Sequence, residues 1–227
     1  MSLANRIIEF NRSLKFTGKL PQGIRIMNPY AENSEALAIS SRFYQKYFDD
    51  EKPRKLILGI NPGRFGAGLT GIPFTDSVRL ENNCDIPVPG IDTRELSSVF
   101  IYEMIEAFGG PEVFYQRYFV SAVCPLGFVK LNNKGREVNY NYYDSKALQE
   151  AVEPFIIKTL EQQISMGIDT SEVFCLGTGK NFKYLQQLNK ERQYFNKVTP
   201  VEHPRYVLQY KLKSKKEYIE KYLKILA

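Results

Sequence analysis

Short apolar runs alternate along this chain with longer stretches whose apolar residues follow helical spacing. Four such runs are typical of buried strands, and they lie at residues 55–60, 118–123, 172–176 and 197–201. The last run is the weakest, because Pro200 lies inside it. Strands that alternate with helices predict a parallel sheet covered on both faces. We therefore expect an α/β fold, a three-layer αβα arrangement with a central four-stranded, mostly parallel sheet, in a single domain over residues 1–227.

The helical patterns have recognisable start and stop signals. They lie at residues 34–48, 181–192 and 215–226, and the first sixteen residues are amphipathic. Thr93 is a candidate cap for a further helix, which the Gly-Gly-Pro triplet at 109–111 would end. Another helix should open at Asp144 or Ser145, and Pro154 should kink or restart it. Residues 61–92 show little helix or strand signal, and so long a loop in a compact domain is more often functional than idle.

Charge is concentrated near the end of the sequence. The net charge is +6, and residues 205–224 carry seven basic residues against two acidic ones. A basic cluster of this kind favours a polyanionic partner, although a solvated helix face gives the same pattern. No apolar run approaches the roughly 20 residues that span a bilayer, and no signal peptide is recognisable. We therefore expect an intracellular, cytoplasmic protein with no membrane partner.

The three cysteines give no sign of a metal site or a disulfide framework. Cys84, Cys124 and Cys175 are widely spaced, and no CxxC pair occurs. We expect them to be buried as small apolar residues. Neither a metal nor an organic cofactor is predicted.

A glycine-rich loop follows the first strand, with the sequence GINPGRFGAGLTGIPF from Gly59 to Phe74. It contains a GxGxxG pattern, but a dinucleotide site needs those glycines to turn directly into a helix. Five residues separate the strand from Gly66, and no helix is expected after Gly71. The segment GTGKN at residues 177–181 lacks the upstream glycine and the Ser or Thr of a P-loop.

Polar residues follow two of the predicted strands at the same edge of the sheet. Asn61 comes after the first strand, beside the tight turn that Pro62 and Gly63 favour, and His203 follows the last strand. Ligands of open α/β sheets bind beyond the carboxyl ends of the strands. Phe74 is a candidate stacking surface for a flat ligand. A purely structural Asx turn and a structural histidine are the alternatives.

These motifs together resemble the uracil-DNA glycosylase superfamily, specifically its single-strand-selective monofunctional branch. The loop from Gly59 to Phe74 is similar to that branch's first motif, including the spacing from Asn61 to Phe74. His203-Pro204 resembles the start of its second motif. YFVSAVCPLGF from residue 118, GTGKNF from residue 177 and MNPYA from residue 27 occur in the same order as their counterparts.

The resemblance implies roles for individual residues. Asn61 would orient the attacking water, Phe74 would stack on an extruded base, and His203 would hydrogen-bond the carbonyl oxygen that gains charge as the base departs. The remaining residues predicted to contact the base are Ile60, Gly63, Ser121 and Asn139. The residues predicted to contact DNA are Arg64, Lys180, Arg205, Lys211 and Lys213.

The chain departs from the family's pattern in three places. Ala122 stands where the family has an asparagine that reads the pyrimidine edge, and an alanine side chain makes no amide contact. Ser121, Asn139 or Asn141 are candidates to replace that contact. The second motif continues as Arg205-Tyr206 instead of Ser-Pro, which alters the loop that enters DNA. Arg64 replaces a proline of the first motif.

The resemblance predicts a monofunctional glycosylase that hydrolyses the N-glycosidic bond of uracil, or of a related deaminated or oxidised base, in single-stranded or damaged duplex DNA. No lysine nucleophile is implied, so no strand-cleaving activity is expected. With DNA as its partner, the protein is expected to be a nucleoid-associated monomer. Ala122 leaves open a non-catalytic module of the same fold that binds modified bases. The GAGLTG segment leaves open a nucleotide-binding α/β enzyme.

Overall fold

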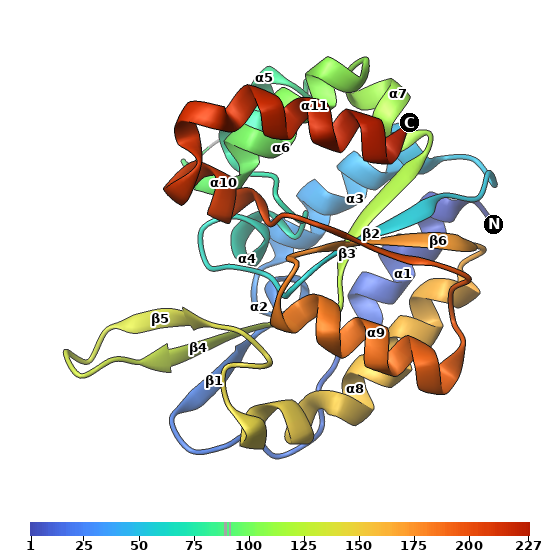
Figure 1. Ribbon diagram of the computed structural model, residues 1–227. Coiled ribbons are helices and arrows are strands. Elements are labelled where there is room, and N and C mark those ends of the chain that lie inside the picture. The colour runs from blue at the N-terminus through green and yellow to red at the C-terminus, as the bar shows by residue number, and fades with distance from the viewer. Residues whose placement is uncertain (89, 91) are drawn as a thin grey trace.

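The computed structural model describes residues 1–88, 90 and 92–227, and its centre is a four-stranded parallel sheet (Figure 1). The strand order is β3-β2-β6-β7, and every pairing in it is parallel. The strands are β2 (Lys55–Gly59), β3 (Tyr118–Ala122), β6 (Asp169–Leu176) and β7 (Val198–Val201). The four predicted strands are therefore confirmed. Pro200 is tolerated because β7 lies at the edge of the sheet, where one side of the strand needs no ladder bonds.

Helices cover both faces of this sheet and complete the predicted three-layer arrangement (Figure 1). Three helices that pack on one another lie on one face, namely α6 (Leu96–Phe108), α10 (Pro204–Tyr210) and α11 (Lys215–Leu226). The other face carries α8 (Lys146–Ser165) and α9 (Lys180–Arg192). The N-terminal α1 (Leu3–Ser13) packs on α3 (Ser34–Phe48). The short elements are α2 (Pro29–Glu32), α7 (Pro111–Tyr115) and the 3₁₀ turn η1 (Leu212–Ser214).

Two predicted helix signals work differently in the structure. Thr93 does not cap α6; its hydroxyl accepts a hydrogen bond from the Ser77 amide, and the helix begins three residues later. Pro154 does not restart α8, which runs without interruption. Pro154 and Glu150, four residues earlier, are both exposed, so water can satisfy the carbonyl that the proline leaves unbonded. Ser145 caps α8 as expected, accepting a hydrogen bond from the Leu148 amide.

A second, antiparallel sheet was not predicted. It consists of β1 (Ile24–Met27), β4 (Gly127–Leu131) and β5 (Glu137–Tyr140), in the order β1-β4-β5. The hairpin of β4 and β5 projects from the body of the molecule, and its tip is a turn held by Asn132 (Figure 1). The inner end of β5 returns to the edge of the parallel sheet, where it contributes to the cavity described below.

The loop from Asn61 to Asp92 also contains more regular structure than expected. It includes α4 (Ala67–Thr70), within the glycine-rich segment, and α5 (Ser77–Asn82). The three cysteines are buried and free, as predicted. None of the helices in the described part of the chain combines the length and apolar composition needed to cross a membrane.

Candidate active site

A cavity of about 220 Å³ lies at the carboxyl ends of β2 and β3, beside the residues that follow β7. Parallel α/β sheets place their ligand sites at this edge. The structure brings most of the predicted site residues into its wall: Ile60, Asn61, Gly63, Phe74, Ser121, Asn139, His203 and Arg205. Segments from four distant parts of the sequence therefore meet around one cavity.

The side-chain amide of Asn61 is fixed between the two sheets. Its Nδ2 donates to the Tyr140 carbonyl at 3.3 Å, and its Oδ1 accepts from the Tyr142 amide at 3.1 Å. These bonds imitate a strand pairing and hold the amide in one orientation. A carbonyl oxygen has two acceptor sites. The second site of Oδ1 is therefore free of the Tyr142 bond and suits a water molecule.

His203 is held in a defined tautomer at the first turn of α10. Its Nδ1 accepts a hydrogen bond from the Arg205 amide at 3.2 Å, so Nδ1 carries no proton and the neutral ring has its hydrogen on Nε2. Burial, and to a smaller extent the nearby Arg205 guanidinium, lowers the pKa of His203 to about 4. The imidazole is therefore neutral at pH 7, and the residue lines the cavity with the ring hydrogen on Nε2.

Phe74 provides an aromatic surface next to this donor. Its backbone is left-handed, with φ of 55°, an uncommon conformation for a large residue. The ring packs so closely on Gly59 that a Cβ at that glycine would lie 3.1 Å from it. The ring centres of Phe74 and His203 are 5.8 Å apart. The imidazole thus lies beside the aromatic surface that the cavity presents to a planar ligand.

The cavity wall around Ala122 also contains amide groups from β5 and from the residue that follows it. Ala122 lines the cavity as the sequence predicts, with Ser121 beside it. Asn139 Oδ1 accepts from the Arg64 amide at 3.0 Å, which orients this side chain and leaves its Nδ2 donors for a ligand. Asn141 lines the same cavity. Strand β5 therefore supplies the Asn139 amide to the cavity, and the residue directly after the strand supplies the Asn141 amide.

The basic residues predicted to contact DNA do not all gather at the cavity. Arg205 lines it, but Arg64 contributes its backbone and stacks its guanidinium 4.8 Å from the Phe65 ring. Lys180 is the first residue of α9, and its Nζ lies 5.8 Å from the Tyr143 ring. Lys211 and Lys213 are exposed residues between α10 and α11 and do not line the cavity.

Sequence reasoning missed two charged residues of the cavity, Arg94 and Glu95, which precede α6. Burial, and then the negative charge of Asp76, raises the pKa of the Glu95 carboxyl to about 7. An isolated glutamate at the start of a helix carries no signal in a single sequence, because acidic residues are common there. In the described part of the chain, no cluster of three or more His, Cys, Asp or Glu side chains is placed to hold a metal ion.

The fold and the cavity define a class of protein. It is a three-layer α/β protein whose cavity at the sheet edge is lined by an aromatic face, oriented amides and a neutral imidazole, a lining suited to a small planar polar ligand.

Comparison with known proteins identifies the family within that class. Residues 45–227 match the family model of the uracil DNA glycosylase superfamily. The crystal structure of wild-type SMUG2 from Pedobacter heparinus is similar over 99% of this chain and 97% of that chain, with 53% sequence identity and a TM-score of 0.97. The chain belongs to the uracil DNA glycosylase superfamily, which confirms the resemblance found in its motifs.

Proposed function

We propose that this protein is a monofunctional DNA glycosylase that hydrolyses the N-glycosidic bond of uracil, or of a related deaminated base, extruded from DNA. The observation that carries the proposal is the shared cavity of Asn61, Phe74 and His203. Membership of the superfamily and the similarity to SMUG2 support the same activity.

The imidazole of His203 suits the departing base. As the glycosidic bond breaks, the sugar gains oxocarbenium character and the base gains negative charge on its carbonyl oxygen. A fixed N–H donor aimed at that oxygen stabilises the transition state without reorganisation. The hydrogen on Nε2 supplies such a donor, since Nδ1 is occupied by the Arg205 amide.

The amide of Asn61 suits the attacking water. A cationic sugar accepts a weak nucleophile, so the water needs orientation more than deprotonation. The free acceptor site of Oδ1 provides that orientation, and the bonds to Tyr140 and Tyr142 keep it in place.

The base reaches the cavity only after extrusion from the stack. Unstacking costs a few kcal/mol and is least for single strands or mispairs. Stacking on Phe74 returns roughly 1–3 kcal/mol. Asn139 and Ser121 then offer hydrogen bonds to the base beside Ala122, and Ile60 and Gly63 complete the wall.

The surface near Arg205 is the proposed path of the DNA backbone, with Arg64, Lys180, Lys211 and Lys213 as phosphate contacts. Replacing Lys211 and Lys213 together by alanine should weaken binding of single-stranded DNA for every sequence alike. It should also reduce the slope of log affinity against log salt by about 1.4, since each phosphate contact on a single strand contributes roughly 0.7. Fluorescence anisotropy at several salt concentrations measures both effects.

The matched control replaces Lys15 and Lys158, two exposed lysines elsewhere on the surface, by alanine. This control has the same change in net charge and should keep the wild-type slope. Equal slopes in both double variants would contradict the proposed path.

The low pKa of His203 predicts how the activity depends on pH below neutrality. Because the pKa of His203 is lowered from 6.5 to about 4, activity should persist down to about pH 5 and fall only near pH 4. The folded protein binds a proton at His203 less readily than the unfolded chain does. The free energy of unfolding should therefore decrease as pH falls from 6.5 toward 4. His203 is the only histidine, so a decline of activity centred near pH 6.5, measured under single-turnover conditions, would show that its ring is not neutral as described.

The activity is tested on labelled single-stranded and mismatched oligonucleotides that carry one uracil, hypoxanthine, xanthine or 5-hydroxymethyluracil. A glycosylase makes the damaged position labile to alkali. Ala122 favours one alternative, a module that binds the modified base without releasing it, and such a module would retard these oligonucleotides while leaving them resistant to alkali. The glycine-rich loop gives little support to the other alternative, a nucleotide-binding enzyme. Its Gly71 is explained by packing within the protein, because a Cβ at this position would lie 2.7 Å from the Tyr30 ring.

A further inference from the structure

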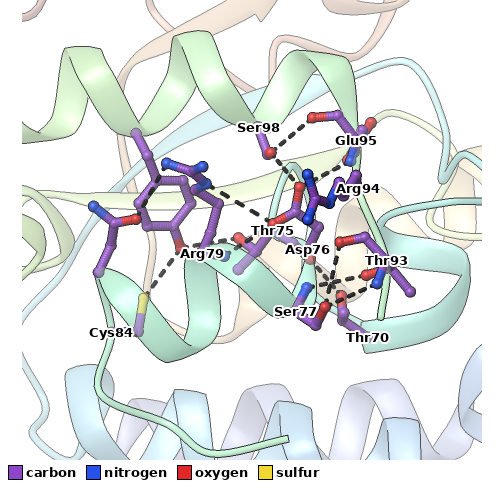
Figure 2. A network of polar contacts seen from close by, with 12 residues as sticks. Thr70, Thr75, Asp76, Ser77, Arg79, Cys84, Thr93, Arg94, Glu95 and Ser98 are labelled. Carbon is purple, nitrogen blue, oxygen red and sulfur yellow. Dashed lines mark hydrogen bonds and ion pairs between the residues drawn. The ribbon is translucent and has the colours of Figure 1, made fainter. Parts of the chain in front are cut away.

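The start of α6 is capped by a residue outside the helix. Asp76 Oδ2 accepts hydrogen bonds from the Glu95 amide at 2.8 Å and from the Ser98 hydroxyl at 2.6 Å (Figure 2). Asp76 thus holds the amide of the N-cap residue, as the second acidic side chain of a capping box does. The side chain of Glu95 itself makes no capping hydrogen bond. The carboxyl group of Glu95 is therefore not needed for the helix.

That carboxyl group lies in the cavity wall without a partner. Its Oε2 is fully enclosed and has no hydrogen bond. The glycine-rich loop makes room for it, because a Cβ at Gly66 would lie only 1.9 Å from Oε2. A buried polar atom with no partner is unfavourable by about 1–3 kcal/mol, and such atoms often mark a site that a ligand completes.

Few charged groups surround this carboxyl. Asp76, from the start of α5, faces it and disfavours its ionised form, as does burial, while Arg205 from α10 favours ionisation. Arg94, beside it in sequence, and neutral His203 line the same cavity. With a pKa of about 7, the group carries its proton through much of the range below neutrality.

We propose that Glu95 is a specificity-determining residue that hydrogen-bonds the lactam edge of the extruded base, the edge that carries an N–H beside a carbonyl. A neutral carboxyl group has one donor and one acceptor, as a side-chain amide does. It therefore supplies the two-sided contact that Ala122 does not make. Uracil and hypoxanthine share this edge, so the contact serves deaminated pyrimidines and purines alike. An ionised carboxylate loses the donor and faces the base carbonyl with a negative charge.

This inference rests on the proposed function, and its test compares Glu95→Gln with Glu95→Ala. Glutamine keeps the donor and acceptor at every pH. Single-turnover release of uracil from a single-stranded oligonucleotide should fall about tenfold per pH unit above pH 7 in the wild type, as one proton is lost. Glu95→Gln should stay level from pH 6 to 9, and Glu95→Ala should be slower by about tenfold or more below pH 7. Glu106→Gln, an exposed change on the same helix, is the control and should keep the wild-type profile.

A pH profile shared by the wild type and Glu95→Gln would overturn the inference, and so would equal rates for the alanine and glutamine variants. Thermal unfolding of each variant checks that the fold is retained.

Affinity for the same oligonucleotide, measured in the same buffers, distinguishes failure of the proposal for Glu95 from failure of the proposed function. If the wild type released no base, the proposed function would fail. Weaker binding above pH 7, present in the wild type and absent from Glu95→Gln, would still support Glu95 as a base contact, and pH-independent binding in both would reject it.

Discussion

Replacing His203 by alanine should lower the rate of base release about 10²–10³-fold, the usual effect of removing one preorganised donor to a developing oxyanion. The loss should appear in the single-turnover rate at saturating enzyme, because the donor acts on charge that exists only in the transition state. Affinity for a uracil-containing oligonucleotide should change much less, since Phe74 and the amides of the cavity remain.

His203 also caps α10, so alanine should reduce stability by about 1 kcal/mol. His203→Ser separates the two roles. Its hydroxyl can accept the Arg205 amide hydrogen bond, which should restore the thermal unfolding temperature, but the short side chain offers no donor to the base. A serine variant as slow as the alanine variant and as stable as the wild type is the expected result. Recovery of activity by serine would mean that His203 acts only by shaping the helix.

Replacing Asn61 by alanine should slow base release by about 10²-fold, the scale of a misplaced reacting group. It should also lower the free energy of unfolding by about 1–3 kcal/mol, because the Tyr142 amide loses its acceptor. Urea denaturation and single-turnover kinetics measure the two effects in the same samples.

The matched control is Asn141→Ala, which removes another amide from the cavity wall without touching the Tyr140 and Tyr142 backbone bonds. It should retain a rate within about tenfold of the wild type, because a contact to the base is replaceable where the water-orienting amide is not. If the Asn61→Ala variant were less stable but kept the wild-type rate, Asn61 would have only a structural role, connecting the two sheets.

The parallel sheet was predictable because its strands are continuous apolar runs, which a single sequence displays clearly. The meeting of Asn61 and His203 at one edge followed from the rule that parallel strands share their carboxyl ends. Phe74 was a candidate because it is aromatic, and the resemblance of the glycine-rich loop to the family's first motif supported it. These features depend on local pattern, on one topological rule and on the resemblance to a known motif.

The antiparallel sheet and Glu95 could not be predicted on those grounds. Strands β1 and β5 are four residues long and partly exposed, so their periodicity is weak. The amide contacts of Asn61 run to residues about 80 positions away, and only the folded chain brings them together. Glu95 is oriented by Asp76, Ser98 and the space beside Gly66, a combination of tertiary contacts with no local signature.

The most direct test of the account is chromatographic detection of free uracil from a single-stranded oligonucleotide, with no metal or cofactor added, for the wild type and the Asn61→Ala, His203→Ala double variant. We predict free uracil from the wild type in amounts equal to the abasic sites formed, with the strand intact until alkali is added, and none above background from the double variant. Tight binding by the wild type without free uracil, or equal release by both proteins, would contradict it.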